Sequence, residues 1–151
     1  MDTQDLQDVG RFLKRTAAFL VAATEILDQD ERVKTSEGLS ISDEGYGKSE
    51  FCAGIYIEAK GRKPKVAVWM GLWAGPDPFL GSGGPPLWIE DLSKDSLFSK
   101  RLQDEFNPAP AHAANGRIGL EWTFDTEIAA HDAGAAIGQR LLKCFAFDAT
   151  T

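Results

Sequence analysis

The chain has 151 residues, of which 43% are hydrophobic and 26% are charged, and its formal net charge at pH 7 is −7. These values are typical of one globular domain that buries a core without disulfides or metal ions. The acidic balance argues against a protein that binds nucleic acid or an anionic membrane through bulk charge, because both attract a surplus of lysine and arginine.

The sequence also indicates the cellular location and whether a cofactor is expected. It contains no apolar run near the roughly 18 residues of a membrane span, and its polar N-terminus lacks a secretion signal, so we expect a cytoplasmic protein. Cys52 and Cys144 are far apart and form no CxxC pair. Two buried thiols are expected, with a single bridge between them as the alternative. No cofactor motif is present, and we expect no cofactor.

Residues Thr3–Asp28 are predicted to form one long amphipathic helix. Leucines recur every seven residues, and a second apolar row runs beside them, which gives a wide apolar face. The two rows are Leu6, Leu13, Leu20 and Leu27, and Phe12, Phe19 and Ile26. The charged residues 28–37 are predicted to be a frayed helix end and a link that stops at Gly38.

A run of strands is expected next. Residues 38–42 are a short strand candidate, and residues 51–60 and 66–73 each alternate between two faces. The short basic turn between these two longer strands favours an antiparallel hairpin. In residues 66–73, Trp69 and Trp73 share the face opposite Val66, Val68, Met70 and Leu72.

The remaining elements complete an α+β pattern. Residues 87–92 are predicted to form a fourth strand, Ser96–Phe106 a helix capped by Ser93 or Asp95, and residues 117–124 a fifth strand. A last helix follows, capped by Asp125 or Thr126 and running to about Phe147. Its expected buried face contains Ile128, Ala135, Leu141, Leu142 and Phe145.

The predicted order is therefore α-β-β-β-β-α-β-α over a single domain, residues 1–151. This order predicts an antiparallel sheet of about five strands, with a long N-terminal helix and a C-terminal helix packed on one face.

Aromatic residues gather in residues 65–92, where three of the four tryptophans flank a loop rich in glycine and proline, residues 75–86. Such rings are either core or a binding surface, and such loops often carry function. If the face with Trp69 and Trp73 is open, it forms a hot-spot surface for a protein partner. If the last helix covers it, both faces of the strand are core. The candidate binding residues are Tyr56, Trp69, Trp73, Phe79 and Trp88.

A second candidate site is the tripeptide Glu58-Ala-Lys60, which resembles the metal-binding motif of PD-(D/E)XK nucleases. That resemblance implies that Glu58 and an upstream acid hold a divalent cation, while Lys60 steadies the attacking water. The upstream acid would be Asp43, Glu44 or Glu50. The family places this motif on its third core strand, whereas here it falls on the second. The alternative is a solvated strand end that enters a turn.

Other catalytic sets are incomplete. His112 and His131 belong to no metal-binding spacing, and both are expected at the surface. The segment around Ser82 does not satisfy G-x-S-x-G. Because chemistry needs several converging groups, the sequence favours a protein without enzymatic activity.

The sequence thus predicts a small acidic protein-binding module of the chaperone, adaptor or inhibitor type, which uses the aromatic sheet face and the loop of residues 75–86. Its size, acidity and element order resemble those of small acidic secretion chaperones. That resemblance implies a protein partner and a homodimer supported by the long first helix. The alternative function is a divalent-metal-dependent nuclease centred on Glu58 and Lys60, with Asp43 as a further ligand. Nucleic acid is not the expected partner, because of the charge.

Overall fold

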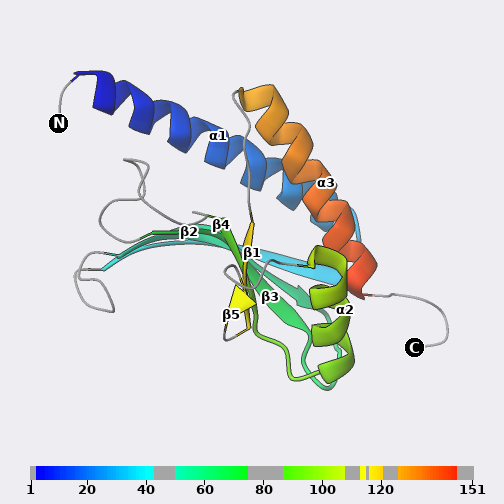
Figure 1. Cartoon of the computed structure of the whole chain (residues 1–151). Coiled ribbons are helices and arrows are strands. Elements are labelled where there is room, and N and C mark those ends of the chain that lie inside the picture. The colour runs from blue at the N-terminus through cyan, green and yellow to red at the C-terminus, as the bar shows by residue number, and fades with distance from the viewer. Residues whose placement is uncertain are drawn as a thin grey trace.

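The structure is a computed structural model that describes residues 3–42, 50–74, 87–107, 113–114, 116–120 and 126–145. Its elements follow the order α1-β1-β2-β3-β4-α2-β5-β6-α3 (Figure 1). The predicted α+β class is confirmed: the chain forms an antiparallel sheet with a long N-terminal helix and a C-terminal helix. The one addition is β5 (Ala113–Ala114), a two-residue strand that the sequence pattern did not reveal.

Helix α1 (Thr3–Asp28) has the bounds that the leucine spacing predicts. Its apolar face is buried toward the C-terminal end, where Phe19, Ala23 and Leu27 enter the core. In its N-terminal half, Leu6 is 60% exposed and Leu13 is 40% exposed. The helix therefore presents apolar side chains beyond the core that it covers.

Strand β1 (Val33–Ser42) is longer than predicted, and the assignment of residues 33–37 to a link was wrong. The run of charged residues suggested a link, but Lys34 and Glu37 are exposed on a strand, and Val33 at its start is buried. The turn before the strand is fixed by Asp30, whose carboxylate accepts hydrogen bonds from the backbone N–H of Arg32 (2.9 Å) and from its guanidinium (2.9 and 2.8 Å).

Within the described residues the sheet has six strands in the order β1-β2-β3-β4-β6-β5, and every neighbouring pair is antiparallel. The predicted hairpin of β2 and β3 is present. Strand β1 lies at one edge of the sheet. The other strands are β2 (Glu50–Ala59), β3 (Ala67–Ala74), β4 (Leu87–Asp91) and β6 (Arg117–Leu120).

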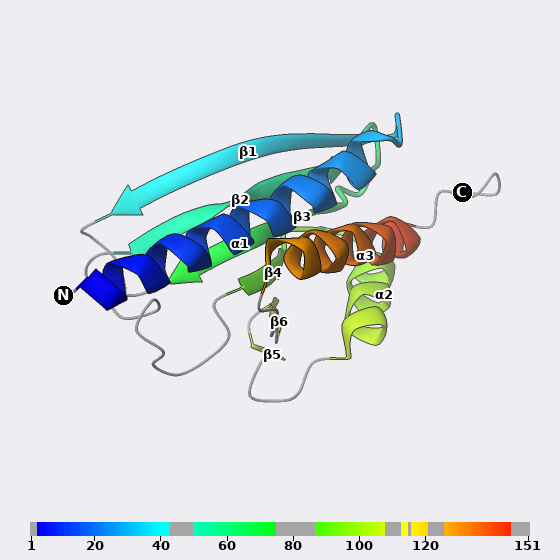
Figure 2. The same cartoon turned by 90° about the horizontal axis from the view of Figure 1, so that it is seen from above.

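Two helices, α1 and α3 (Glu127–Phe145), lie side by side over one face of this sheet, as the two views show (Figures 1 and 2). The shorter α2 (Ser96–Phe106) packs against α3, where Phe98 and Phe145 stack with ring centroids 5.2 Å apart. The core lies between the helices and the sheet, and its strand residues include Ile55, Ile57, Val68, Met70 and Ile89.

Small residues set the contact between α1 and α3. A Cβ on Gly134 would clash with the carbonyl oxygen of Phe19, and one on Gly138 would lie 3.1 Å from that of Ala23. The buried face of α3 accordingly runs through Ala130, Gly134 and Gly138. The expectation that Ile128 lies on the buried face was wrong, since its side chain is 77% exposed.

Within the part of the chain that the structure describes, none of the helices is both long and apolar enough to cross a bilayer.

Candidate functional site: an aromatic sheet face

The two faces of the sheet differ in what covers them. Val68 and Met70 on β3 are buried beneath α1 and α3, whereas Trp69 between them points to the opposite face. Neither α1 nor α3 lies on that opposite face (Figures 1 and 2). The alternative in which the last helix covers the aromatic residues is therefore wrong. We call the side with Trp69 the open face.

Three aromatic side chains form a cluster on the open face: Tyr56 on β2, Trp69 on β3 and Trp88 on β4. Tyr56 is the register partner of Trp69, and all three side chains are partly buried. Trp88 is the register partner of Gly71, two residues along β3 from Trp69. Partly buried rings on adjacent strands hold their orientation and still present an apolar surface to solvent.

Two glycines shape the surface beneath these rings. Gly54 and Gly71 are register partners, and a Cβ on Gly71 would clash with the backbone of Ala53 and Gly54. A Cβ on Gly54 would lie 2.7 Å from Cζ2 and 2.8 Å from Cε2 of Trp69. The indole of Trp69 therefore lies against the bare backbone of Gly54, and this contact fixes the position of the ring.

A lysine extends the cluster at one end of the sheet. The Nζ atom of Lys65 lies 5.5 Å from the centroid of the Tyr56 ring, within the range of a cation–π contact. The pKa of Lys65 is raised above its ordinary value, first by interaction with the Tyr56 hydroxyl and further by the charge of Glu58. Lys34 and Lys60 are exposed nearby, on the open-face positions of β1 and of the turn after β2.

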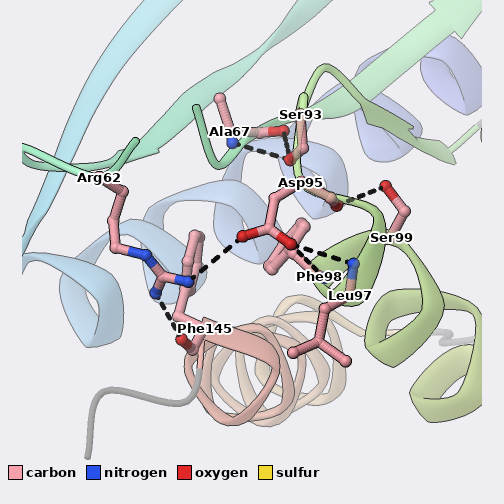
Figure 3. A network of polar contacts seen from close by, with 8 residues as sticks. All are labelled: Arg62, Ala67, Ser93, Asp95, Leu97, Phe98, Ser99 and Phe145. Atoms are coloured by element: carbon pink, nitrogen blue, oxygen red, sulfur yellow. Dashed lines mark hydrogen bonds and ion pairs between the residues drawn. The ribbon is translucent and has the colours of Figure 1, made fainter. Parts of the chain in front are cut away.

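A polar network holds this end of the sheet in place (Figure 3). The N–H of Ala67 donates to Ser93 Oγ (3.0 Å), and the Ser93 hydroxyl donates to the Ala67 carbonyl (3.0 Å). The Ser93 side chain thus continues the ladder between β3 and β4 where the strand itself has ended. The N–H of Lys94 donates to the Lys65 carbonyl (2.8 Å), which fixes the backbone that carries Lys65.

The same network anchors two helix termini. Asp95 Oδ1 accepts hydrogen bonds from the N–H groups of Leu97 (3.0 Å) and Phe98 (3.1 Å), so Asp95 is the N-cap of α2, one of the two predicted caps. Arg62 donates to the carbonyl of Phe145 at the end of α3 (3.0 Å) and lies 3.6 Å from the Asp95 carboxylate. These contacts are structural, and they position the turn that borders the open face.

On β4 and β6, Glu90 and Arg117 are register partners and form a partly exposed ion pair (4.0 Å) on the open face. Glu90 is also the register partner of Trp69. The aromatic cluster therefore has lysines beyond it at one end of the strands and this ion pair beside it, across β4 and β6. An apolar centre with a polar rim is the usual arrangement of a protein-binding surface.

The candidate binding residues are only partly described. Tyr56, Trp69 and Trp88 lie on one face of three neighbouring strands, whereas the side chain of Trp73 and the whole of Phe79 lie outside the described residues. The sequence reasoning missed Gly54 and Lys65. The alternation of β2 already places Gly54 on the face of Tyr56, but contact with Trp69 depends on the register between β2 and β3.

The Glu58-Ala-Lys60 motif lies at the lysine-rich end of the open face. Glu58 is partly buried, and its register partners are Lys34 and Ala67. Asp43, Glu44 and the side chain of Glu50 lie outside the described residues. Ser42, which precedes Asp43, lies eight positions along β1 from Lys34, or roughly 26 Å at about 3.3 Å per residue.

The other candidate groups form no reactive set. Among the described residues, no three His, Cys, Asp or Glu side chains are placed to hold a metal ion. His131 is exposed, as predicted, and its Nε2 lies 3.9 Å from the Glu25 carboxylate. Cys144 is a buried free thiol, also as predicted, and burial raises its pKa to about 11. His112 and the Cys52 side chain are not described.

Comparisons with protein-family models, with curated proteins and with solved structures find no match to this chain.

Proposed function

We propose that the chain is a protein-binding module that takes its partner on the aromatic cluster of the open face. The observation that carries the proposal is the placement of Tyr56, Trp69 and Trp88 on the side of the sheet that α1 and α3 leave uncovered. Tryptophan and tyrosine dominate binding energy at protein interfaces, and rings held by their own fold lose little conformational entropy when a partner binds.

The surroundings of the cluster indicate what the partner presents. Lys34, Lys60 and Lys65 at one end favour a segment with carboxylates next to an apolar or aromatic side chain. The loop of residues 75–86, with Phe79, is included in the proposal on sequence grounds alone: it joins the strands that carry Trp69 and Trp88, and it lies outside the described residues. The chaperone, adaptor or inhibitor role, the homodimer and the cytoplasmic location are part of this proposal.

The nuclease alternative has less support. It needs Glu58, Lys60 and an upstream acid to converge on one cation. The register separates Glu58 from the end of β1 that leads to Asp43, and Glu58 instead neighbours Lys34 and Lys65. We therefore assign Glu58 and Lys60 to the polar rim of the binding surface.

The test of the proposed function compares three variants in one capture experiment. A photo-reactive cross-linker on the wild-type chain identifies a partner, which is then purified and titrated. We expect Trp69→Ala to weaken its affinity by about 30-fold or more, the effect of losing a hot-spot ring of about 2 kcal/mol. Ile128→Ala is the matched control, because Ile128 is apolar and 77% exposed on α3. Equal affinities for the wild type, Trp69→Ala and Tyr56→Ala would contradict the proposal.

A further inference from the structure

A second surface of the molecule offers unpaired backbone groups. The N–H of Lys60 donates to the Arg32 carbonyl (2.8 Å), and the N–H of Ala59 donates to the Val66 carbonyl (3.0 Å). Hydrogen-bonded pairs recur at every second residue of an antiparallel ladder, so Lys34 and Ser36 bond to β2. The N–H and C=O groups of Thr35 and Glu37 consequently point away from the sheet. Among the described residues, no strand lies beside β1 on that side.

The edge formed by β1 is long and regular. Its register with β2 is continuous from Val33 to Ser42, without a bulge, and its ten residues include no proline. Proteins commonly blunt exposed edges with short strands, bulges, prolines or charges, because a long regular edge pairs with other strands. Lys34 and Glu37 are charges of that kind. Lys34 points to the open face, and Glu37 lies beside the groove on the other face. An exposed edge of this kind is where an extended peptide adds to a sheet as a further strand.

An apolar groove runs beside this edge, on the face that the helices cover. It has a volume of about 330 Å³ and lies between α1 and the first two strands. Its lining residues are Ala17, Leu20, Val21 and Thr24 from α1, Glu37 from β1, and Ala53, Gly54 and Ile55 from β2. Val21 is 53% exposed, and Leu13, one leucine repeat before Leu20, is 40% exposed. The exposed apolar side chain of Val21 therefore lies in a groove that also reaches β1 at Glu37.

We propose that β1 and this groove accept an extended segment of a partner polypeptide as an added strand. Only a strand satisfies a row of outward N–H and C=O groups at this spacing. Thr35 and Glu37 share the helix-covered side of the sheet with Ile55 and Ile57, their register partners on β2. A residue paired with Glu37 on the added strand points to the same side, and so toward the groove that Glu37 and Val21 both line.

Charge defines the partner segment further. Glu37 is the charged residue of the groove lining, and the whole chain carries a net charge of −7. On its groove-facing side the segment therefore carries apolar side chains and one lysine or arginine, which lies opposite Glu37. A second copy of this chain fits less well, because it brings the same negative charge to the contact. This surface is separate from the aromatic cluster and goes beyond the proposed function.

Hydrogen exchange on the full chain tests this proposal. The probe is a capped ten-residue peptide of alternating valine and threonine, as long as β1, in which one central valine is replaced by lysine, and the reference carries glutamate at that position. We expect the lysine peptide to slow amide exchange of Thr35 and Glu37 by about tenfold or more, because these amides gain partners on binding. The same peptide, N-methylated on the amides that face β1, should give no protection.

Variants make each element of the proposal falsifiable. Val21→Glu should abolish the protection, and because Val21 is half-exposed, this variant is expected to fold. Ile128→Glu on α3 is its matched control. Glu37→Lys should reverse the preference toward the glutamate peptide. Trp69→Ala should leave the protection unchanged, which separates a failure here from a failure of the proposed function. Equal protection by the N-methylated peptide, or protection that grows with protein concentration and needs no peptide, would overturn the proposal.

Discussion

The indole of Trp69 lies against Gly54 on the neighbouring strand, so close that a Cβ on Gly54 would be 2.7 Å from Cζ2 of the ring. The most prominent ring of the open face is thus positioned by the absence of a side chain beneath it. A ring held in this way is preorganised for contact with a partner, because its orientation is already restricted in the free protein.

The first prediction concerns this contact. Gly54→Ala should lower the free energy of unfolding by about 1–3 kcal/mol, the usual effect of overpacking, because the new methyl group meets both the indole and the carbonyl oxygen of Met70 (2.5 Å). Urea unfolding measures the change, and tryptophan emission should shift as Trp69 is displaced. Gly10→Ala is the control: no atom lies within 4 Å of its Cβ, and the exposed helix should gain about 0.5–1 kcal/mol. A Gly54→Ala variant as stable as the wild type would show that Trp69 does not depend on Gly54.

The second prediction concerns the contact between α1 and α3. Gly134→Ala should lower the free energy of unfolding by about 1–3 kcal/mol, because its Cβ meets the carbonyl oxygen of Phe19. This loss should exceed the gain that Ala brings to an exposed helix position. That oxygen belongs to a backbone that cannot rotate away, so the two helices must move apart. Thermal and urea unfolding measure the effect. An unchanged midpoint would mean that α3 does not approach α1 as closely as described.

Local patterns were sufficient for the elements whose cause is local. The leucine spacing predicts Thr3–Asp28 because one periodic apolar face defines that helix. Alternation locates β2 and β3, and the short turn between them dictates their antiparallel pairing. Ser93 and Asp95 were the two predicted caps for α2. The choice between them depends on whether the Ser93 hydroxyl or the Asp95 carboxylate reaches the free N–H groups of the first helical turn.

Features that depend on packing between distant segments could not be predicted. The buried face of α3 follows Gly134 and Gly138 because close approach to α1 requires small residues, whereas the sequence pattern gave weight to large ones such as Ile128. Strand β1 begins within a charged run because only the sheet-edge position allows Lys34 and Glu37 to stay in solvent. Which face of the sheet stays open depends on the path of α3, which no local pattern encodes.

The third prediction concerns acid stability. The hydrogen bonds from Arg32 lower the pKa of Asp30 to about 2 from its ordinary value of 3.8. The folded state thus favours the carboxylate, and this contribution is present above about pH 4 and is lost as the pH falls through 2. Asp30→Asn should flatten the loss of stability between these pH values in urea unfolding, while Asp132→Asn on the exposed surface of α3 should not. Identical pH profiles for wild type and Asp30→Asn would contradict this assignment.

The fourth prediction separates the binding module from the nuclease. Mg²⁺ or Mn²⁺ at millimolar concentration should raise the melting temperature by less than about 1 °C, since a site that binds a cation only in the folded state would stabilise it by more. The melting temperature of Glu58→Ala should respond to both ions as the wild type does. A clear rise with Mn²⁺ in the wild type that disappears in Glu58→Ala would instead support a metal site at Glu58 and direct the next assays to DNA and RNA cleavage.

The central claim is that the aromatic cluster faces solvent and is available to a partner. Hydroxyl-radical footprinting of the free chain, read by mass spectrometry residue by residue, tests this claim most directly. After correction for intrinsic reactivity, Tyr56, Trp69 and Trp88 should be modified far faster than Phe19, Phe98 and Phe145, which are at most 2% exposed. If Trp69 and Tyr56 are as protected as these core phenylalanines, another part of the molecule covers the open face, and the proposed binding surface is wrong.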